Sequence, residues 1–347
     1  MVEESTWKGV LQVRKVLLGS LIVFFIAAVF AFPAMGNPLR IGIMQIVDHP
    51  ALDAARDGVM DALEEEYGYV RGEDIVYDIQ SAQGDVATAN TIARKFVSDQ
   101  VDLIVSIATP TSQAAANATR DIPIVFSAVT DPVAAGLVQS LDEPGANVTG
   151  ASDLTPVALQ LELLHFLFPE IQTVGTMYNA GEVNSVITND LAIEAVGEMG
   201  LELHEATVAT TADVSMAARS LAGRAEAIYV STDNTVVSAL ETVISVTLEN
   251  KIPLVLADPT TVEQGALLAL GFNYYLHGRQ TASMVARILE GENPADIPVE
   301  FARRLELLVN RNTVEQLGLD AEEFDVLLEE FVENKALEGI EVDLKYT

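Results

Sequence analysis

The sequence has 347 residues, of which 50% are hydrophobic, and this length suits two domains of ordinary size. It contains no cysteine, which excludes disulfides, thiolate metal sites, a cysteine nucleophile and the lipid-accepting cysteine of a bacterial lipoprotein. The 19 basic and 51 acidic residues give a net charge of −32, so binding to nucleic acid is not expected. High acidity with only six lysines is typical of salt-adapted proteins, whose self-repulsion is screened by salt.

The first 36 residues are predicted to be a targeting segment. Lys8, Arg14 and Lys15 precede the apolar run of residues 16–36, and this order is typical of a secretory signal. Ala34 and Gly36 stand where small residues precede a cleavage site. The run is just long enough to span a bilayer, so an uncleaved N-terminal membrane anchor is the alternative. Either form predicts that the remaining chain lies outside the cytoplasm, in the periplasm or at the outer face of the membrane.

From residue 40 onward, short apolar runs alternate with segments of helical periodicity. The predicted elements of the first half, in chain order, are a strand at 40–46, a helix at 51–68, a strand at 74–82, a helix at 85–98, a strand at 101–108, a helix from Pro110, a strand at 122–129 and a helix from Pro132.

The alternation restarts after Gly150. The second half is predicted to contain a helix at 156–168, a strand at 173–179, a helix at 182–200, a strand at 201–208, a helix at 212–222, a strand at 225–232, a helix at 234–249 and a strand at 252–258. Two such runs predict an α/β protein with two doubly wound, Rossmann-like lobes, and the count of units does not fit a (β/α)₈ barrel. Residues 321–347 are strongly acidic and are predicted to be a solvated amphipathic helix or a frayed tail.

Polar side chains follow the predicted strands of both halves, at the edge where open α/β sheets bind ligands. One such residue is best explained as a helix cap, but their recurrence in both halves predicts a ligand-binding cleft. The candidate ligand-binding residues are Gln45, His49, Thr109, Thr111, Ser127, Ala128, Thr130, Asp131, Asn179, Glu182, Asn184, Ser185, Asp233, Asn234 and Asp258.

Motifs of common enzyme classes are absent from the sequence. It has no G-x-G-x-x-G or P-loop phosphate cradle and no G-x-S-x-G nucleophile elbow. Its four histidines are scattered and lack metal-ligand spacing. Asp233 and Asp258 are conceivable as an acid and base pair, yet nothing in the sequence separates their pKa values. We therefore expect no catalytic residue, no metal and no cofactor.

Seven ordered motifs resemble one known family. The stretches "IGIMQIVDHPALDAARDG", "TPTSQAAANAT", "FSAVTDPVAAGLV", "NVTGASDLTP", "YNAGEVNS", "YVSTDN" and "LGFNYYLHGRQTA" are similar to the substrate-binding proteins of ABC transporters, tryptophan/tyrosine type. The resemblance covers about residues 38–320. It implies a type I periplasmic-binding-protein fold in which three crossover strands join the lobes. The implied first lobe is 38–153 plus about 269–298, and the second is 154–268 plus about 299–320. The missing lipobox cysteine departs from the commonest form of the family.

The resemblance also implies a function and partners. The chain is expected to be a monomeric solute receptor that delivers an aromatic amino acid to an ABC permease. A zwitterionic ligand would place its carboxylate on Thr109, Thr111, Ser127 and Thr130. Its ammonium would meet Asp233 first, with Asp131 or Glu182 as alternatives. Residues that would close from the second lobe are Asn179, Asn184 and Ser185, with Asp258 behind them. The ligand side chain would rest near Gln45, His49 and Ala51, with Phe272 or Tyr274 near the hinge or in the core.

Two other functions remain open on the sequence alone. A ligand-sensing module would present its closed form to a membrane sensor, and would carry a helix-rich effector region after the lobes. A secreted α/β enzyme would carry a recognisable nucleophile or cofactor cradle. Neither feature is found in the sequence, so a solute receptor is the favoured interpretation.

Overall fold

The computed structural model describes residues 37–302 and 304–347. The predicted signal or anchor at 1–36 lies outside the described residues, and we describe the compact unit that begins at Leu39. Within the described part of the chain, no helix has the length and apolarity needed to cross a membrane.

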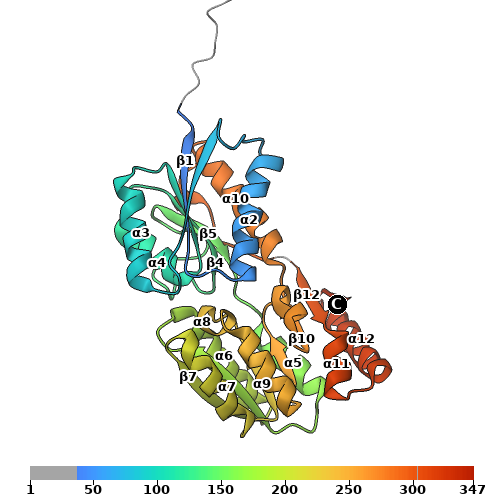
Figure 1. The fold of residues 1–347 in the computed structure, drawn as a ribbon. Coiled ribbons are helices and arrows are strands. Elements are labelled where there is room, and N and C mark those ends of the chain that lie inside the picture. The colour runs from blue at the N-terminus through green and yellow to red at the C-terminus, as the bar shows by residue number, and fades with distance from the viewer. Residues whose placement is uncertain (1–36, 303) are drawn as a thin grey trace, which may run out of the picture. The chain divides into compact units, whose positions relative to one another are not determined.

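The first lobe is built on a parallel six-stranded sheet with the order β11-β5-β4-β3-β1-β2. Helices α2 and α10 lie on one side of this sheet, and α3 and α4 lie on the other (Figure 1). The strands are β1 (Leu39–Gln45), β2 (Ile75–Ser81), β3 (Leu103–Ile107), β4 (Ile124–Val129), β5 (Val148–Ser152) and β11 (Glu300–Phe301). The helices are α2 (Pro50–Glu65), α3 (Val86–Ser98), α4 (Thr109–Ala118) and α10 (Tyr274–Leu289).

The second lobe repeats this winding on a seven-stranded sheet with the order β13-β12-β10-β9-β8-β6-β7. Strand β12 runs antiparallel to β10, and the other pairings in this sheet are parallel. The strands are β6 (Thr173–Asn179), β7 (Glu202–Val208), β8 (Ala227–Val230), β9 (Leu254–Leu256), β10 (Leu268–Gly271), β12 (Leu305–Val309) and β13 (Val342–Tyr346). The helices are α5 (Val157–Leu167), α6 (Val183–Glu198), α7 (Val214–Ala222), α8 (Asn234–Val237), α9 (Leu240–Asn250), α11 (Arg311–Leu317) and α12 (Ala321–Leu337).

The chain passes between the two sheets after β5, after β10 and after β11. Strand β10 still belongs to the second sheet and β11 still belongs to the first, so the last two crossings lie a few residues later than the sequence predicted. Most of the predicted strands and helices are present in both lobes, which gives the expected pair of doubly wound sheets.

Residues 321–347 are not a tail but part of the second lobe. Helix α12 stacks Phe331 on Phe166, with ring centroids 5.5 Å apart, and strand β13 pairs with β12. Lys335 donates to the Glu162 carboxylate at 2.6 Å from a largely buried position. The amphipathic helix expected here is present, but the expectation that it is solvated was wrong, because Phe324, Leu328 and Phe331 recur at helical spacing and bury one face of α12.

Three other local expectations differ from the structure. The helix predicted from Pro132 is a series of turns, in which the Asp131 carboxylate accepts the N–H groups of Val133 and Ala134. The helix predicted at 234–249 is divided into α8 and α9. Strand β5 went unpredicted because its sequence, VTGAS, has no apolar run, and the elements after residue 258 were not assigned individually.

Helices α2 and α10 approach each other closely through two glycines. A Cβ atom on Gly278 would lie 2.0 Å from the carbonyl oxygen of Ala55, and one on Gly58 would lie 2.1 Å from that of Tyr275. Glycine is therefore needed at both positions for the helices to come this near. Their contact fixes the starts of α2 and α10, which carry His49 and Tyr274, on the same pocket.

Candidate functional site

The strand order of each lobe reverses at one place, and the two reversals face one pocket. They lie between β1 and β3 in the first lobe and between β6 and β8 in the second. Ligands of open α/β sheets bind at the carboxyl ends of strands at such positions. The pocket is lined by His49, Ala51, Leu52, Ala128, Thr130, Asp153, Asn184, Thr232, Asp233, Asn234, Val237, Asp258 and Tyr274.

His49 forms part of the first-lobe wall. It precedes α2, and its Nδ1 accepts the N–H of Leu52 at 3.5 Å, which leaves the ring proton on Nε2. Burial lowers the pKa of His49 to about 4, so the imidazole is neutral at neutral pH. The Asn234 side chain interacts with this imidazole from the second lobe. His49 therefore serves both as a helix cap and as a contact across the cleft.

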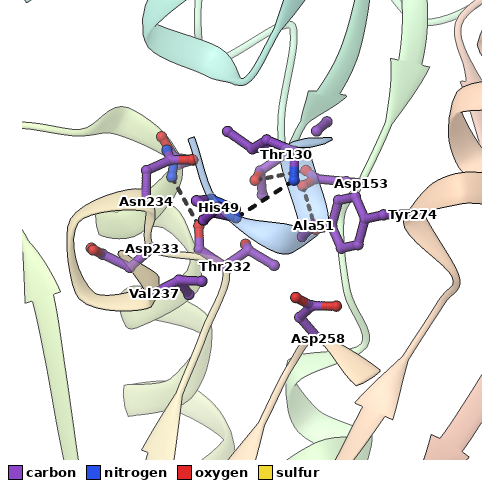
Figure 2. Close-up of a pocket in the computed structure, with 13 residues that line it drawn as sticks. His49, Ala51, Thr130, Asp153, Thr232, Asp233, Asn234, Val237, Asp258 and Tyr274 are labelled. Carbon is purple, nitrogen blue, oxygen red and sulfur yellow. Dashed lines mark hydrogen bonds between the residues drawn. The ribbon is translucent and has the colours of Figure 1, made fainter. Parts of the chain in front are cut away.

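One end of the pocket is acidic, as Figure 2 shows with Asp153, Tyr274 and Asp258. Asp153 is held by two hydroxyl donors, Thr130 at 3.0 Å and Tyr274 at 2.9 Å. Asp258 accepts the N–H of Thr260 through Oδ1, whereas its Oδ2 is buried and has no partner among the described residues. Burial, with a smaller contribution from the nearby Asp153, raises the pKa of Asp258 to about 6. This end of the pocket therefore has an unused carboxylate oxygen that a cation would satisfy.

Asp233 plays a different part from Asp258. It is fully buried, its Oδ1 accepts the N–H of Val236 at 2.7 Å, and its Oδ2 accepts the N–H of Asn179 at 2.6 Å. The first of these bonds caps α8 and the second ties β6 to it. Both carboxylate oxygens of Asp233 therefore accept backbone N–H groups of the second lobe. Asp233 acts as a helix cap, which is the role expected of a single polar residue at a strand end.

Two polar atoms of the second-lobe wall have no hydrogen-bond partner within residues 37–302 and 304–347. They are Asn184 Oδ1 and Thr232 Oγ1. The Asn184 amide nitrogen donates to the Thr232 carbonyl at 3.1 Å, which orients this amide. Glu182 supports the same wall, because it accepts from Asn234 at 2.5 Å and from Thr235 at 2.8 Å. Buried polar atoms without a partner are uncommon in native proteins and mark positions that a ligand or water would complete.

Ala128 lines the pocket with its backbone in the left-handed region, at a φ of 57°. Its N–H donates to His277 Nε2 at 3.2 Å, and the pairing of β4 with β5 is irregular at this point. A non-glycine residue in this conformation is held there by its surroundings. Burial lowers the pKa of His277 to about 4, so this ring stays neutral and keeps Nε2 as an acceptor.

Of the residues predicted from the sequence, seven line this pocket: His49, Ala128, Thr130, Asn184, Asp233, Asn234 and Asp258. Gln45 and Asp131 lie outside it, the first donating to Asp48 and Asp53 and the second capping a turn. Thr111 also lies outside and donates to the Ile107 carbonyl at 2.5 Å.

The remaining predicted residues do not line this pocket, although Asn179 and Glu182 line another one. Ser127 accepts from Thr281 at 3.1 Å in the core of the first lobe. Asn179, Glu182 and Ser185 surround Asp233 and Asn234. Thr109 is buried at the start of α4, and its hydroxyl has no partner in the part of the chain that the structure describes.

Sequence reasoning missed Leu52, Asp153, Thr232 and Val237 as pocket residues. Asp153 follows β5, so the missed strand concealed it. Thr232 follows β8 and is the neighbour of Asp233, which was predicted. Only the structure shows that the Thr232 hydroxyl has no partner among the described residues. Ala51 and Tyr274 were expected near the ligand side chain or the hinge, and both line the pocket.

The two hydroxyls after β4 should respond differently to removal. Ser127→Ala should leave ligand affinity unchanged and cost about 1 kcal/mol of stability, because its bond to Thr281 lies in the core. Thr130→Val should weaken ligand binding about tenfold, because it removes the hydroxyl that holds the Asp153 carboxylate in position in the pocket. Thermal melting and calorimetric titration of both variants separate these effects, and equal affinity losses in the two variants would contradict the assignment.

Comparisons with known proteins place the chain in a family. The sequence profile described as "ABC transporter substrate binding protein" matches residues 40–331. A curated relative, the "Tyrosine-binding protein" of Clostridioides difficile (strain R20291), is 43% identical over 280 residues, covering 81% of this chain and 81% of that protein.

Two solved structures are similar over most of their length. A conserved domain protein from Vibrio cholerae is 44% identical, with a TM-score of 0.82, and the match covers 84% of this chain and 98% of that one. A Streptococcus ABC domain in complex with L-Trp is 33% identical, with a TM-score of 0.80 and the same coverage. The predicted type I periplasmic-binding-protein fold is confirmed by these neighbours. The profile match, the identities and the shared fold agree, and the chain belongs to the family of ABC transporter substrate-binding proteins.

Proposed function

We propose that this chain binds an aromatic amino acid between its lobes and delivers it to the permease of an ABC importer outside the cytoplasm. The observation that carries the proposal is the buried Oδ2 of Asp258 in the pocket, which has no partner among the described residues and calls for a cationic group. The names of the relatives support the class of ligand, since one is a tyrosine-binding protein and another was solved with L-Trp. We propose a binding role without catalysis, for a receptor that acts as a monomer.

We propose that the ligand's ammonium sits on Asp258 rather than on Asp233, the first choice from the sequence. Both oxygens of Asp233 already accept backbone N–H groups, whereas Asp258 has one oxygen without a partner among the described residues. Asp153 adds a second carboxylate at the same end of the pocket. A buried carboxylate gains most from a cation when no other donor satisfies it.

The ligand's carboxylate is proposed to meet the first turn of α2. Pro50 has no N–H, and the N–H groups of Leu52 and Asp53 are bonded to His49, which leaves that of Ala51 on the pocket wall. The positive end of the helix dipole favours an anion at this place. Of the hydroxyls predicted for this role, those of Thr111 and Thr130 donate elsewhere, and those of Thr109 and Ser127 do not line the pocket.

The ligand's ring is proposed to lie between Leu52 of the first lobe and Val237 of the second. Both line the pocket, and they are its larger aliphatic side chains. An aromatic ring placed between them is covered from both lobes, so binding and lobe closure reinforce each other. The ring then points from the acidic end toward the wall formed by Asn184 and Thr232.

Ligand affinity should fall when the pH is lowered from 7 to 5. Burial raises the pKa of Asp258 to about 6, so below that pH the free protein holds a proton that the ligand's ammonium must displace. The Kd should rise by about tenfold per pH unit below the pKa and stay level above pH 7. Stability of the ligand-free protein should change in the opposite sense, because a raised carboxyl pKa favours the folded state at low pH and this gain is lost as pH rises through 6.

The pKa values of the groups near Asp258 show which variant is the right control for this pH dependence. Burial also raises the pKa of Asp153, that of Tyr274 is raised well above its normal value, and that of His49 is lowered to about 4. Asp258→Asn should therefore flatten most of the dependence between pH 5 and 7. Titration calorimetry across this range measures it, and a Kd that stays constant in the unmodified protein would remove Asp258 as the ammonium partner.

A ligand panel tests the proposed function. Residues 37–347 should be stabilised by L-tyrosine or L-tryptophan and not by sugars or nucleosides. A ligand at 100 times its Kd adds about 2.7 kcal/mol of stability, which a thermal shift detects easily. Stabilisation by a sugar or purine alone, with none by any amino acid, would refute the ligand class.

A further inference from the structure

The second-lobe end of the pocket carries an acceptor that the proposed zwitterion head does not use. Asn184 is the second residue of α6 and only 3% exposed. Its amide nitrogen faces three acceptors, the Thr232 carbonyl at 3.1 Å, the Ser185 hydroxyl at 3.2 Å and the Glu182 carboxylate at 3.4 Å. Exchanging the amide nitrogen and oxygen would put two acceptors against each other, so the oxygen takes the remaining position. There, Oδ1 has no donor among the described residues.

We propose that Asn184, assisted by Thr232, selects ligands whose aromatic side chain ends in a hydrogen-bond donor. This inference rests on the proposed function and adds to it a rule of specificity. An amide oxygen accepts and cannot donate, so a phenol O–H or an indole N–H satisfies it and a phenyl ring does not. Thr232 adds a hydroxyl that also lacks a partner within the described part of the chain, and Figure 2 shows this residue between His49 and Val237.

The alternative orientation would put the ligand's ammonium on Asn184 and its ring at the acidic end. Charge argues against it. At the acidic end, one carboxylate oxygen of Asp258 has no partner within the described part of the chain, and a carboxylate stabilises a buried cation far better than an amide oxygen does. The Glu182 carboxylate near Asn184 is already engaged by Asn234 and Thr235. The ligand's ammonium therefore lies at Asp258, and the far end of the ligand's aromatic side chain lies at Asn184.

The preference for tyrosine and tryptophan over phenylalanine depends on the cost of leaving one buried oxygen atom without a hydrogen-bond donor. A phenylalanine ring would bury Asn184 Oδ1 with no donor, whereas tyrosine and tryptophan each bring one. Sites built to bind a hydroxyl reject the analogue that lacks it, and the loss for one buried unpaired group corresponds to about 10- to 100-fold in affinity. The protein should accordingly bind tyrosine and tryptophan well and phenylalanine poorly.

A ligand series on the unmodified protein tests the rule without any mutation. Calorimetric titration would compare L-tyrosine, 4-amino-L-phenylalanine, L-phenylalanine and 4-fluoro-L-phenylalanine. The first two carry a donor at the end of the ring, and the last two do not. The donor-bearing pair should bind about 10- to 100-fold more tightly. If phenylalanine and tyrosine bind equally, the specificity rule is wrong and the proposed function stands. If none of the four binds, the proposed function itself has failed.

A pair of asparagine variants then assigns the selection to Asn184. Asn184→Leu should weaken tyrosine binding and leave phenylalanine binding unchanged or stronger, so that the ratio of their affinities collapses. Asn189→Leu is the matched control, because Asn189 lies on the same helix, is 4% exposed and also has an unpaired Oδ1 in the described structure, but does not line the pocket. It should leave the ratio unchanged.

The same variants distinguish the two ligand orientations. If Asn184 held the ammonium, Asn184→Leu would weaken tyrosine and phenylalanine equally, and that result would overturn the proposal. Should Asn184→Leu fail to fold, Thr232→Val tests the same wall with an isosteric change that removes one hydroxyl. It should lower tyrosine affinity severalfold more than phenylalanine affinity, and equal effects on the two ligands would count against the proposal.

Discussion

Asp258→Asn should raise the Kd for an aromatic amino acid by roughly two to four powers of ten. The substitution replaces the unpaired Oδ2 with an amide group and removes the counter-charge of a buried ammonium. Breaking one side of such a pair costs about 3–5 kcal/mol. The stability of the ligand-free protein should not fall, because burying this carboxylate is already unfavourable. Its raised pKa of about 6 reflects that cost. Titration calorimetry and melting of the same variant measure both effects.

Asp233→Asn provides the contrast. Asp233 accepts two backbone N–H groups, so its neutralisation should lower the melting temperature of the second lobe. Its effect on affinity should be much smaller than that of Asp258→Asn. If Asp233→Asn abolishes binding while Asp258→Asn binds normally, the ammonium sits where the sequence first suggested.

Gly278→Ala should destabilise the first lobe by about 3 kcal/mol, at the upper end of what overpacking costs. The added Cβ would lie 2.0 Å from the Ala55 carbonyl oxygen, a backbone atom that moves only if α2 and α10 separate. Separation would also disturb His49 and Tyr274 at the starts of these helices, so ligand affinity should fall together with stability. Urea denaturation with and without ligand measures both losses.

Gly197→Ala is the matched control for this substitution. Gly197 lies inside α6, and a Cβ there would meet no atom within 4 Å. Alanine has the higher helix propensity, so this variant should gain about 0.5–1 kcal/mol. A Gly278→Ala protein as stable as the Gly197→Ala protein would contradict the close approach of α2 and α10.

The doubly wound lobes were predictable because each strand and helix leaves a local signature in the sequence. Apolar runs marked β1, β3 and β4, and helical periodicity marked α2 and α3. Strand β5 was missed since its small residues, including Gly150, carry no apolar run. The segment of α12 was predicted to be a solvated helix or a frayed tail, because its charge concealed the buried face.

The pocket was harder to predict than the fold. A strand-end aspartate looks the same in the sequence whether it caps a helix, as Asp233 does, or turns a free oxygen toward a cavity, as Asp258 does. Which of the two happens depends on backbone N–H groups brought from elsewhere in the chain, such as that of Asn179. Such tertiary contacts also decide that Ser127 bonds to Thr281 in the core. Salt adaptation and cleavage of the N-terminal signal stay predictions.

The central claim is that the pocket receives an amino-acid zwitterion with its ammonium on Asp258. Titration of residues 37–347 with L-tyrosine, with tyramine and with 3-(4-hydroxyphenyl)propionate tests it most directly. These ligands share the phenol, while tyramine lacks the carboxylate and the propionate lacks the ammonium. We expect one tyrosine bound per chain, weaker tyramine binding, and no measurable binding of the propionate. Propionate binding as tight as that of tyrosine would contradict the account.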